Sequence, residues 1–527
     1  MRTATCEPGD LPARLFVPAN IGRGVPMPSS LPLPRRETPG PSRDANPVID
    51  LNHAPAVTAN SASQPPRGSA CPGLLRIVAA RDGGICRVKL PGGALSAAHA
   101  HAIADAAETH ACGVIEMTNR ANLQIRGVRA GEEHALIERL LAAGLGPHAP
   151  AAEGTSAARF ANPAADDVRN LMISPTAGRD PAALIDTSGL AAQILTLLQS
   201  EARFAALSPK FALLLDGGEQ LAMLTHPHDI WLAALQDEVG DGVRFAFGLA
   251  GCPPVAPNDP AALAAVRPEH VVALIDALLH TFLDLAAPDE MRMRDLLARQ
   301  SAASVLARID ARAGFPLLRD AQISAWRRPR AQPALRFGVR PQREPGMSHV
   351  GGSPPLGRID APTLRALAAL SQEAGKGILR MTPWQSVLLP DVPAQAAPAA
   401  LARLTSLGFA CDRAQPFARL IACAGSPGCA KAHADTKADA QQLARRLPAD
   451  AEVHLSGCTR SCAAAHPVPF TLLAVAPGRY DLYQHDPANA VAVADLAPRF
   501  GHCIAQHLTI EHAADRLDRL SRSAPDA

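Results

Sequence analysis

The chain has 527 residues, enough for two to four domains with a large hydrophobic core. A formal net charge of +2 and an aromatic content of 3% give no basis for a nucleic-acid-binding surface or for base-stacking platforms. Eleven cysteines are too few for a disulfide scaffold. No uninterrupted apolar run of about 18 residues occurs, so we expect no transmembrane helix and a reduced, cytoplasmic setting.

The segment 1–66 differs in composition from the rest of the chain. It is crowded with Pro, Ser, Arg and Asn and has little hydrophobic periodicity. Such a segment buries too little apolar surface to offset the entropy lost on ordering. We expect residues 1–66 to form a disordered, Pro-rich extension.

The folded region contains a helix-and-strand module that occurs twice. Segments 91–125 and 355–389 align without a gap when Gly93 is placed on Gly357. Each copy predicts a glycine turn, an Ala/Leu-rich helix, a strand ending in Met-Thr and a second short strand, at 122–128 and 386–390. The other matched pairs are Leu95 and Ile359, Gly113 and Gly377, Val114 and Ile378, Met117 and Met381, Thr118 and Thr382, and Ile125 and Leu389.

A second duplication follows at a slightly smaller offset. Ser174 aligns with Cys423, Asp180 with Cys429 and Pro209 with Cys458, again without a gap. The order along the chain is therefore module A, module B, module A′, module B′, which predicts pseudo-twofold symmetry between the halves. Only the second copy of module B has the cysteines to hold a metal centre.

Four cysteines in two short loops form the strongest motif of the chain. Five residues separate Cys423 from Cys429, three separate Cys458 from Cys462, and 28 lie between the pairs. Four thiolates from two loops suit a cubane iron–sulfur cluster, because each iron takes one cysteine sulfur. Structural zinc is the main alternative, although its cysteine pairs usually enclose two to four residues. The remaining alternative is that the four cysteines are unrelated buried thiols.

The residues around these cysteines favour a tight metal-binding loop. Gly425, Ser426, Pro427 and Gly428 allow a sharp turn. Residues 431–447 predict a helix whose positive N-terminal end faces the first pair, and residues 452–455 predict a strand that leads to Cys458. His454 and His466 flank the second loop, where a hydrogen bond to a nearby carbonyl is the simplest role for each.

The duplicated modules and the cysteine quartet resemble the nitrite/sulfite reductase superfamily, over roughly residues 67–510. Within it the loop sequences are most similar to the precorrin-3B synthase family, on the segments 70–74, 423–430 and 454–458. The resemblance implies an α+β fold, with duplicated ferredoxin-like half-domains and two α/β nitrite/sulfite-reductase-type domains. The implied divisions are a disordered extension (1–66), half-domain 1 (67–145), α/β domain 1 without cluster (146–330), half-domain 2 (331–398), α/β domain 2 with a 4Fe-4S cluster (399–510) and a C-terminal tail (511–527).

The resemblance also implies substrate-binding cations. Siroheme reductases bind their anionic substrate with Arg and Lys side chains, and the matching residues are Arg120, Arg169 and Lys210. Those reductases have a second Lys two positions after the first, where this chain has Ala212. Because a charge-assisted hydrogen bond contributes about 1.5–3 kcal/mol, this loss argues against a site for a small dianion. The three cations suit the carboxylates of a tetrapyrrole equally well.

The implied reaction is hydroxylation of precorrin-3A by O2 in aerobic cobalamin biosynthesis. Cys423, Cys429, Cys458 and Cys462 are the implied ligands of a 4Fe-4S cluster, and a mononuclear non-heme iron is a further candidate cofactor. No nicotinamide-binding or Walker A motif occurs, so electrons are expected from a separate donor protein. The alternatives are a siroheme-dependent sulfite or nitrite reductase, and a zinc-stapled binding protein without catalysis.

Overall fold

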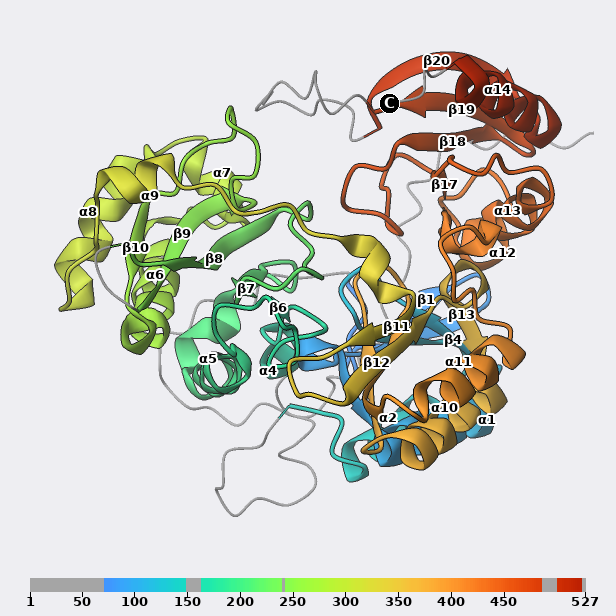
Figure 1. Ribbon diagram of the computed structural model, residues 1–527, viewed down its shortest axis with the longest axis horizontal. Coiled ribbons are helices and arrows are strands. Elements are labelled where there is room, and N and C mark those ends of the chain that lie inside the picture. The colour runs from blue at the N-terminus through green and yellow to red at the C-terminus, as the bar shows by residue number, and fades with distance from the viewer. Residues whose placement is uncertain (1–70, 148–162, 239–241, 486–499, 524–527) are drawn as a thin grey trace, which may run out of the picture. The chain divides into compact units, whose positions relative to one another are not determined.

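The computed structural model describes residues 71–147, 163–238, 242–485 and 500–523 (Figure 1). The extension predicted over residues 1–66 lies outside these ranges. The ten cysteines within them form no disulfide. No helix in the described ranges is long and apolar enough to cross a membrane.

The two copies of the first module have the same elements in the same order, as predicted. The first copy contains β1 (Val78–Ala80), β2 (Gly83–Val88), β3 (Ala94–Ser96), α1 (Ala97–His110), β4 (Val114–Met117), β5 (Leu123–Val128) and α2 (Glu133–Ala142). The second contains β11 (Gly338–Pro341), β12 (Met347–Gly352), β13 (Arg358–Asp360), α10 (Ala361–Ala374), β14 (Ile378–Met381), β15 (Val387–Pro393) and α11 (Ala397–Ser406). From β2 to α2, every element of the first copy begins at one constant offset from its counterpart, the offset that separates Gly93 from Gly357.

The two copies exchange a strand. One sheet has the order β1-β2-β5-β4-β13, and the other has the order β11-β12-β15-β14-β3. β3 pairs antiparallel with β14, Leu95 facing Leu379, and β13 pairs antiparallel with β4, Ile359 facing Ile115. Each copy therefore completes the sheet of the other, and neither has a full sheet of its own.

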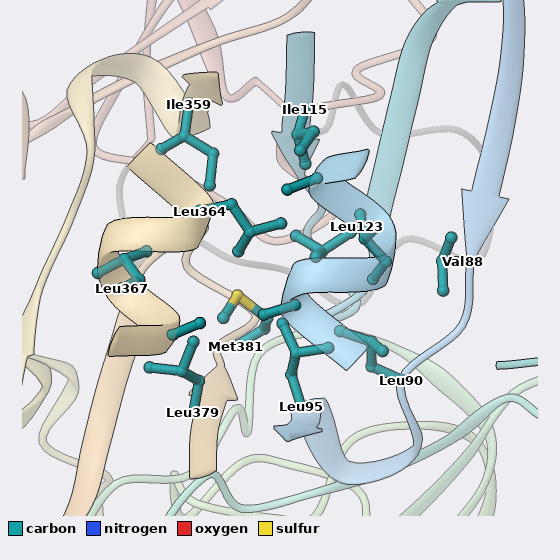
Figure 2. Packing of buried hydrophobic residues seen from close by; sticks show 14 of the residues in the cluster. Val88, Leu90, Leu95, Ile115, Leu123, Ile359, Leu364, Leu367, Leu379 and Met381 are labelled. Carbon is teal, nitrogen blue, oxygen red and sulfur yellow. The ribbon is translucent and has the colours of Figure 1, made fainter. Parts of the chain in front are cut away.

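Both copies contribute to one hydrophobic core beneath these sheets. Leu95, Ile115 and Leu123 from the first copy converge with Leu364 and Met381 from the second (Figure 2). Small Ala residues on one face of α1 allow α1 and α10 to lie side by side (Figure 1). Ala100, Ala104 and Ala107 have no exposed surface, so the joint core depends on close approach of the helices.

The two α/β domains also share one topology. The first contains α4 (Pro163–Asp167), β6 (Leu171–Ile173), α5 (Ser188–Ser200), β7 (Leu213–Asp216), β8 (His228–Gln236), β9 (Val243–Gly251), β10 (Ala264–Val266), α6 (Val271–Leu285), α7 (Met293–Leu297), α8 (Ala302–Ala313) and α9 (Ala321–Ala325). The second contains β16 (Leu420–Ala422), α12 (Gly425–Gly428), α13 (Thr436–Ala444), β17 (Val453–Ser456), β18 (Phe470–Ala476), β19 (Arg479–Gln484), β20 (His502–Leu508) and α14 (Ile510–Ser523). In each sheet the first three strands are parallel and the last two antiparallel.

The gapless alignment of the two α/β domains is wrong beyond their first strands. β6 and β16 are separated by the same number of residues as Ser174 and Cys423 in the alignment. The next strands, β7 and β17, begin at Leu213 and Val453, which are separated by fewer residues. Cys458 follows β17, whereas Pro209 precedes β7, so these two residues are not counterparts. The alignment fails because α5 and the turn after it are longer than α13.

The C-terminal segment 511–527 is not a separate tail, contrary to prediction. Its described part belongs to α14, which packs against the sheet of the second α/β domain. Ala513, Ala514 and Leu517 are buried there with the residues of that core. The domain therefore extends at least to the end of α14.

Candidate functional site

The two cysteine loops leave neighbouring strands of one sheet. Cys423 follows β16, and Cys458 follows β17 after Gly457. These strands are parallel and hydrogen-bonded, Ala422 facing Leu455, so both loops start at the same edge. A single helical turn, α12, then carries the chain from Cys423 to Cys429.

Hydrogen bonds join the two loops. The backbone N–H of Gly457 donates to Cys423 Sγ at 3.2 Å, and the N–H of His433 donates to the carbonyl of Gly457 at 2.9 Å. A Cβ atom on Gly457 would lie 2.6 Å from the Cβ of Ala432, which is closer than two side chains can pack. Glycine is therefore required where the loops meet.

The four cysteine thiols come together in this region. Burial raises the pKa of the Cys462 thiol, and the neighbouring Cys458, Cys423 and Cys429 raise it further. Within the described residues, no group of three or more His, Cys, Asp or Glu side chains is close enough to hold a single metal ion. In a cubane cluster each thiolate binds its own iron, so the thiols need not meet at a single point.

The helix after the first pair begins later than predicted. α13 starts at Thr436, not at residue 431, because the Asp435 carboxylate caps it by accepting from the Ala438 N–H at 3.2 Å. Its N-terminal end does approach the cysteines as expected. The Thr436 hydroxyl lies 3.4 Å from Cys423 Sγ and donates to the Cys423 carbonyl at 2.9 Å.

The last cysteine loop contacts both half-domains at equivalent turns. Asn119 Nδ2 donates to the Cys462 carbonyl at 3.2 Å, and Gln385 Nε2 donates to the Ala463 carbonyl at 3.1 Å. The turns are symmetry-related: Ala121 and Gln385 both have a φ of 57°. The duplicated half-domains thus hold the Cys462 loop from two sides.

A buried ion cluster fixes the first cysteine loop to the same half-domains. Glu116 on β4 lies 3.3 Å from Arg126 and 2.7 Å from Arg358, and Lys437 of α13 lies 3.7 Å from it. Arg126 also donates to the carbonyl of Gly428 at 2.9 Å. These charged groups offset the burial of the Glu116 carboxyl and hold its pKa below the ordinary value.

Arg120 interacts electrostatically with two other arginines, Arg87 and Arg292, which come from elements far apart in the sequence. Burial lowers the pKa of Arg120 to about 10, and the charges of Arg292 and Arg87 lower it as well. Burial also lowers the pKa of Arg87, against the opposing effect of the Cys71 and Cys462 thiols. Among the described residues, none forms a hydrogen bond or ion pair with the guanidinium of Arg120, and its backbone N–H donates to the Thr118 hydroxyl at 3.3 Å.

The other two predicted cations lie at the amino-terminal edge of the first α/β sheet. Arg169 precedes β6 and Lys210 precedes β7, and the Asn170 side chain joins these segments by donating to the carbonyls of Pro209 and Phe211. Arg169 is buried and donates to Asp166 at 2.6 Å, so it is committed to the protein. Lys210 is exposed. The structure therefore joins Arg120 with Arg87 and Arg292 and leaves Arg169 in an internal ion pair.

Two buried histidines in this region were not identified from the sequence. His226 and His228 are 3% and 2% exposed, their ring centroids lie 5.2 Å apart, and neither Nδ1 has a partner within the described structure. Burial, followed by the charges of Arg120 and Arg292, lowers the pKa of His228 to about 3. Burial also holds the pKa of His226 well below the ordinary value. The signal was the triplet His-Pro-His, whose second histidine begins the hydrophobic strand β8.

Two family models match the chain. The model described as "Nitrite/Sulfite reductase ferredoxin-like half domain" matches residues 79–143 and 340–407, the two half-domains. The model described as "Nitrite and sulphite reductase 4Fe-4S domain" matches residues 164–317, the first α/β domain. The four cysteines lie outside the range matched by that second model.

Individual relatives include ferredoxin-dependent nitrite reductases and one precorrin-3B synthase. The chain is 29% identical to a chloroplastic ferredoxin–nitrite reductase of Zea mays over 396 residues, which cover 71% of this chain and 67% of the relative. It is 27% identical to a precorrin-3B synthase of Sinorhizobium sp. over 472 residues, which cover 88% and 90%. The fold matches that of the Mycobacterium tuberculosis NirA protein, with a TM-score of 0.66, 22% identity and coverage of 83% of this chain and 80% of that one.

Proposed function

The chain is an oxidoreductase of the nitrite/sulfite reductase superfamily, and we propose that its reaction is the oxygen-dependent hydroxylation of precorrin-3A to precorrin-3B. The observation that carries this proposal is the set of half-buried arginines beside the cysteine loops. Arg120 forms no ion pair with a described residue, and the like charges of Arg292 and Arg87 act on it more strongly than the carboxylate of Asp229 does. Such an arrangement is unfavourable without an anionic ligand, and precorrin-3A carries many carboxylates.

The residue at position 212 favours a large anion over a small one. Ala212 is 4% exposed, and its N–H donates to Asp229 at 2.8 Å. The second lysine that siroheme reductases use at this position is thus absent, and an acidic residue lies beside it. A site with scattered cations suits carboxylates spread around a macrocycle better than it suits one small dianion.

The extent of the similarity supports the same choice. The precorrin-3B synthase aligns with 90% of its length, against 67% for the maize nitrite reductase. We therefore take the precorrin-3B synthase as the better guide to the whole chain, although its identity is only 27%.

The cysteine quartet suits a 4Fe-4S cluster, with Cys423, Cys429, Cys458 and Cys462 as the ligands. All four are thiols, and the N–H of Gly457 already donates to one of them, which favours the thiolate form that binds metal. When bound, such a cluster supplies or accepts single electrons. The relatives named for ferredoxin suggest an electron-donor protein of that kind.

A siroheme-dependent nitrite or sulfite reductase is the second candidate. Ferredoxin–nitrite reductases recur among the relatives, including one of Synechococcus elongatus that is 28% identical over 394 residues. This candidate predicts that siroheme remains bound to the purified protein. It also predicts reduction of nitrite or sulfite without any need for O2.

The direct test supplies anaerobically purified protein with precorrin-3A, a reductant and isotopically labelled O2. We expect a product that contains one labelled oxygen atom, and no product from a Cys458→Ser variant. Production of ammonia from nitrite, or of sulfide from sulfite, without any turnover of precorrin-3A would instead establish the second candidate.

A further inference from the structure

Lys437 is a buried lysine of α13 whose ammonium group contacts three parts of the fold. Its Nζ donates to the carbonyl of Leu356 in the second half-domain at 2.7 Å and to the carbonyl of Ala422 at 3.3 Å. The carboxylate of Glu116 in the first half-domain lies 3.7 Å away. Three acceptors around one nitrogen suit a charged ammonium, which has three donors and no lone pair. Because Ala422 directly precedes Cys423, a buried positive charge lies beside the first cysteine of the quartet.

Arg126 on β5 places a second positive charge beside the other cysteine of this loop. Its Nη2 donates at 2.9 Å to the carbonyl of Gly428, which directly precedes Cys429. The guanidinium is buried and pairs with Glu116 at 3.3 Å and with Asp82 at 2.8 Å. Each cysteine of the first loop is therefore preceded by a carbonyl that accepts from a buried cation.

The ion cluster that these residues form has one positive charge in excess. Its members are three cations and two carboxylates, namely Lys437, Arg126, Arg358, Glu116 and Asp82. Arg358 and Asp82 are partly exposed, and the other three are buried. Solvent screens buried charges much less than exposed ones, so the excess charge acts on the thiols of the adjacent loop.

We propose that this ion cluster sets the reduction potential of the iron–sulfur cluster that the four cysteines would hold, with Glu116 as the residue that limits the positive charge. This rests on the proposed function only in that the cysteines bind a 4Fe-4S cluster, and it holds for either candidate reaction. The potential of such a cluster depends on the charge around it, because reduction adds one negative charge. The buried cations favour the reduced form, and the Glu116 carboxylate opposes them.

The test measures the midpoint potential of the full-length protein and of the variants Glu116→Gln, Lys437→Gln and their combination. An anaerobic titration with dithionite and mediator dyes is followed by the EPR signal of the reduced cluster. Glu108→Gln is the matched control, because Glu108 belongs to the same half-domain but is exposed and pairs with Arg365. Asp82→Asn is a milder variant, since Asp82 is partly exposed and its replacement leaves the buried carboxylate in place.

We expect the midpoint potential to rise in Glu116→Gln and, by less, in Asp82→Asn, to fall in Lys437→Gln, and to stay unchanged in Glu108→Gln. The double variant should return towards the wild-type value, because the two changes of charge cancel. A purely structural role would not give shifts of opposite sign. Unchanged potentials, shifts of one sign, or loss of iron and sulfide from Glu116→Gln, Lys437→Gln and Asp82→Asn alike would overturn this inference alone. A wild type without iron and sulfide would overturn the cluster assignment as well.

Discussion

At the residue scale, the site contains groups that are poorly satisfied without a ligand. Arg120 has lost much of its hydration but forms no ion pair with a described residue, and two arginines act on it more strongly than Asp229 does. His226 and His228 are buried, and their Nδ1 atoms have no hydrogen-bond partner among the residues that the structure describes. Unsatisfied polar groups and adjacent like charges reduce stability, and proteins retain them mainly where function requires them.

Replacement of Arg120 should therefore separate stability from binding. We expect Arg120→Met to raise the free energy of unfolding of the ligand-free protein by roughly 1 kcal/mol, because it removes a half-buried charge that adjoins other cations and forms no ion pair with a described residue. The same variant should bind uroporphyrin III, a stable tetrapyrrole octacarboxylate, more weakly. Urea unfolding and a binding titration measure the two effects, with exposed Lys210→Met as a control that should leave stability unchanged. A destabilised Arg120→Met protein would show that the guanidinium has a structural partner.

Buried neutral histidines predict a loss of stability in acid. Burial lowers the pKa of His454 from 6.5 to about 3, so between these values the unfolded chain binds a proton that the folded chain does not. The contribution of neutral, buried His454 to the free energy of unfolding is complete above pH 6.5. Below that pH, this free energy decreases by up to about 1.4 kcal/mol per pH unit. Urea unfolding between pH 7 and 5 should show a shallower decline for His454→Gln than for the wild type. Parallel curves would mean that His454 titrates normally in the folded protein.

The sequence predicted these residues unevenly, for a physical reason. The cysteine quartet is recognisable because each pair is local and its spacing reflects the chemistry of the ligands. The family motif marks Arg120, but Arg87 and Arg292 interact with it only through the tertiary fold, and neither has a local pattern that distinguishes it from a surface arginine. Arg169 matched a family motif, but in the structure it forms an ion pair with Asp166. The sequence could not show this pairing, because it depends on the burial of Asp166, three residues earlier.

At the scale of elements, the loop-to-loop contact at Gly457 is a tightly constrained feature of the cysteine site. A Cβ there would meet Ala432 at 2.6 Å and Cys423 Sγ at 3.3 Å. The contact joins the end of β17 to the loop that carries Cys423 and Cys429. The position of both cysteine pairs therefore depends on the absence of a side chain at one residue.

Gly457→Ala should reduce the iron and sulfide content, because the two loops must separate to accommodate the methyl group. Gly189→Ala is the control, since a Cβ at Gly189 in the first turn of α5 meets nothing within 4 Å. We expect the control to keep full cluster content. Full cluster content in Gly457→Ala as well would mean that the loops adapt without loss of the site.

Element type was easier to predict than element length. The strand before Cys458 and the helix after Cys429 are both present, but Asp435 starts α13 later than periodicity suggested. The comparison of the two α/β domains failed for a similar reason. Helix and loop lengths between β6 and β7 differ from those between β16 and β17, and a gapless alignment cannot represent such a difference.

At the scale of the whole molecule, exchange of β3 and β13 makes the two half-domains interdependent. Each sheet ends in a strand from the other half of the chain, and residues from both halves fill one core (Figure 2). The internal repeat predicted, residue by residue, which elements of the two copies correspond. It could not predict the exchange of β3 and β13 between the sheets, because strands of similar sequence pair equally well within a copy or between copies.

This architecture predicts that a destabilising substitution in one half of the chain also destabilises the other half. Leu95 on β3 is fully buried and faces Leu379 on β14, so Leu95→Ala should cost about 2–5 kcal/mol. Hydrogen exchange should then quicken together in β4 and β5 of the first half and in β14 and β15 of the second. Leu184→Ala is the control, because Leu184 is 41% exposed. Faster exchange confined to one half would contradict a shared core.

The most direct test of the central claim is an anaerobic assay of iron, acid-labile sulfide, zinc and extractable tetrapyrrole on the purified protein, beside its Cys458→Ser variant. We predict four iron and four sulfide per chain in the wild type, no siroheme, and no cluster in a folded Cys458→Ser protein. One zinc without sulfide, or a full cluster in the variant, would contradict the assignment of Cys423, Cys429, Cys458 and Cys462. Stoichiometric siroheme would leave the cluster assignment unchanged, but it would make nitrite or sulfite the expected substrate in place of precorrin-3A.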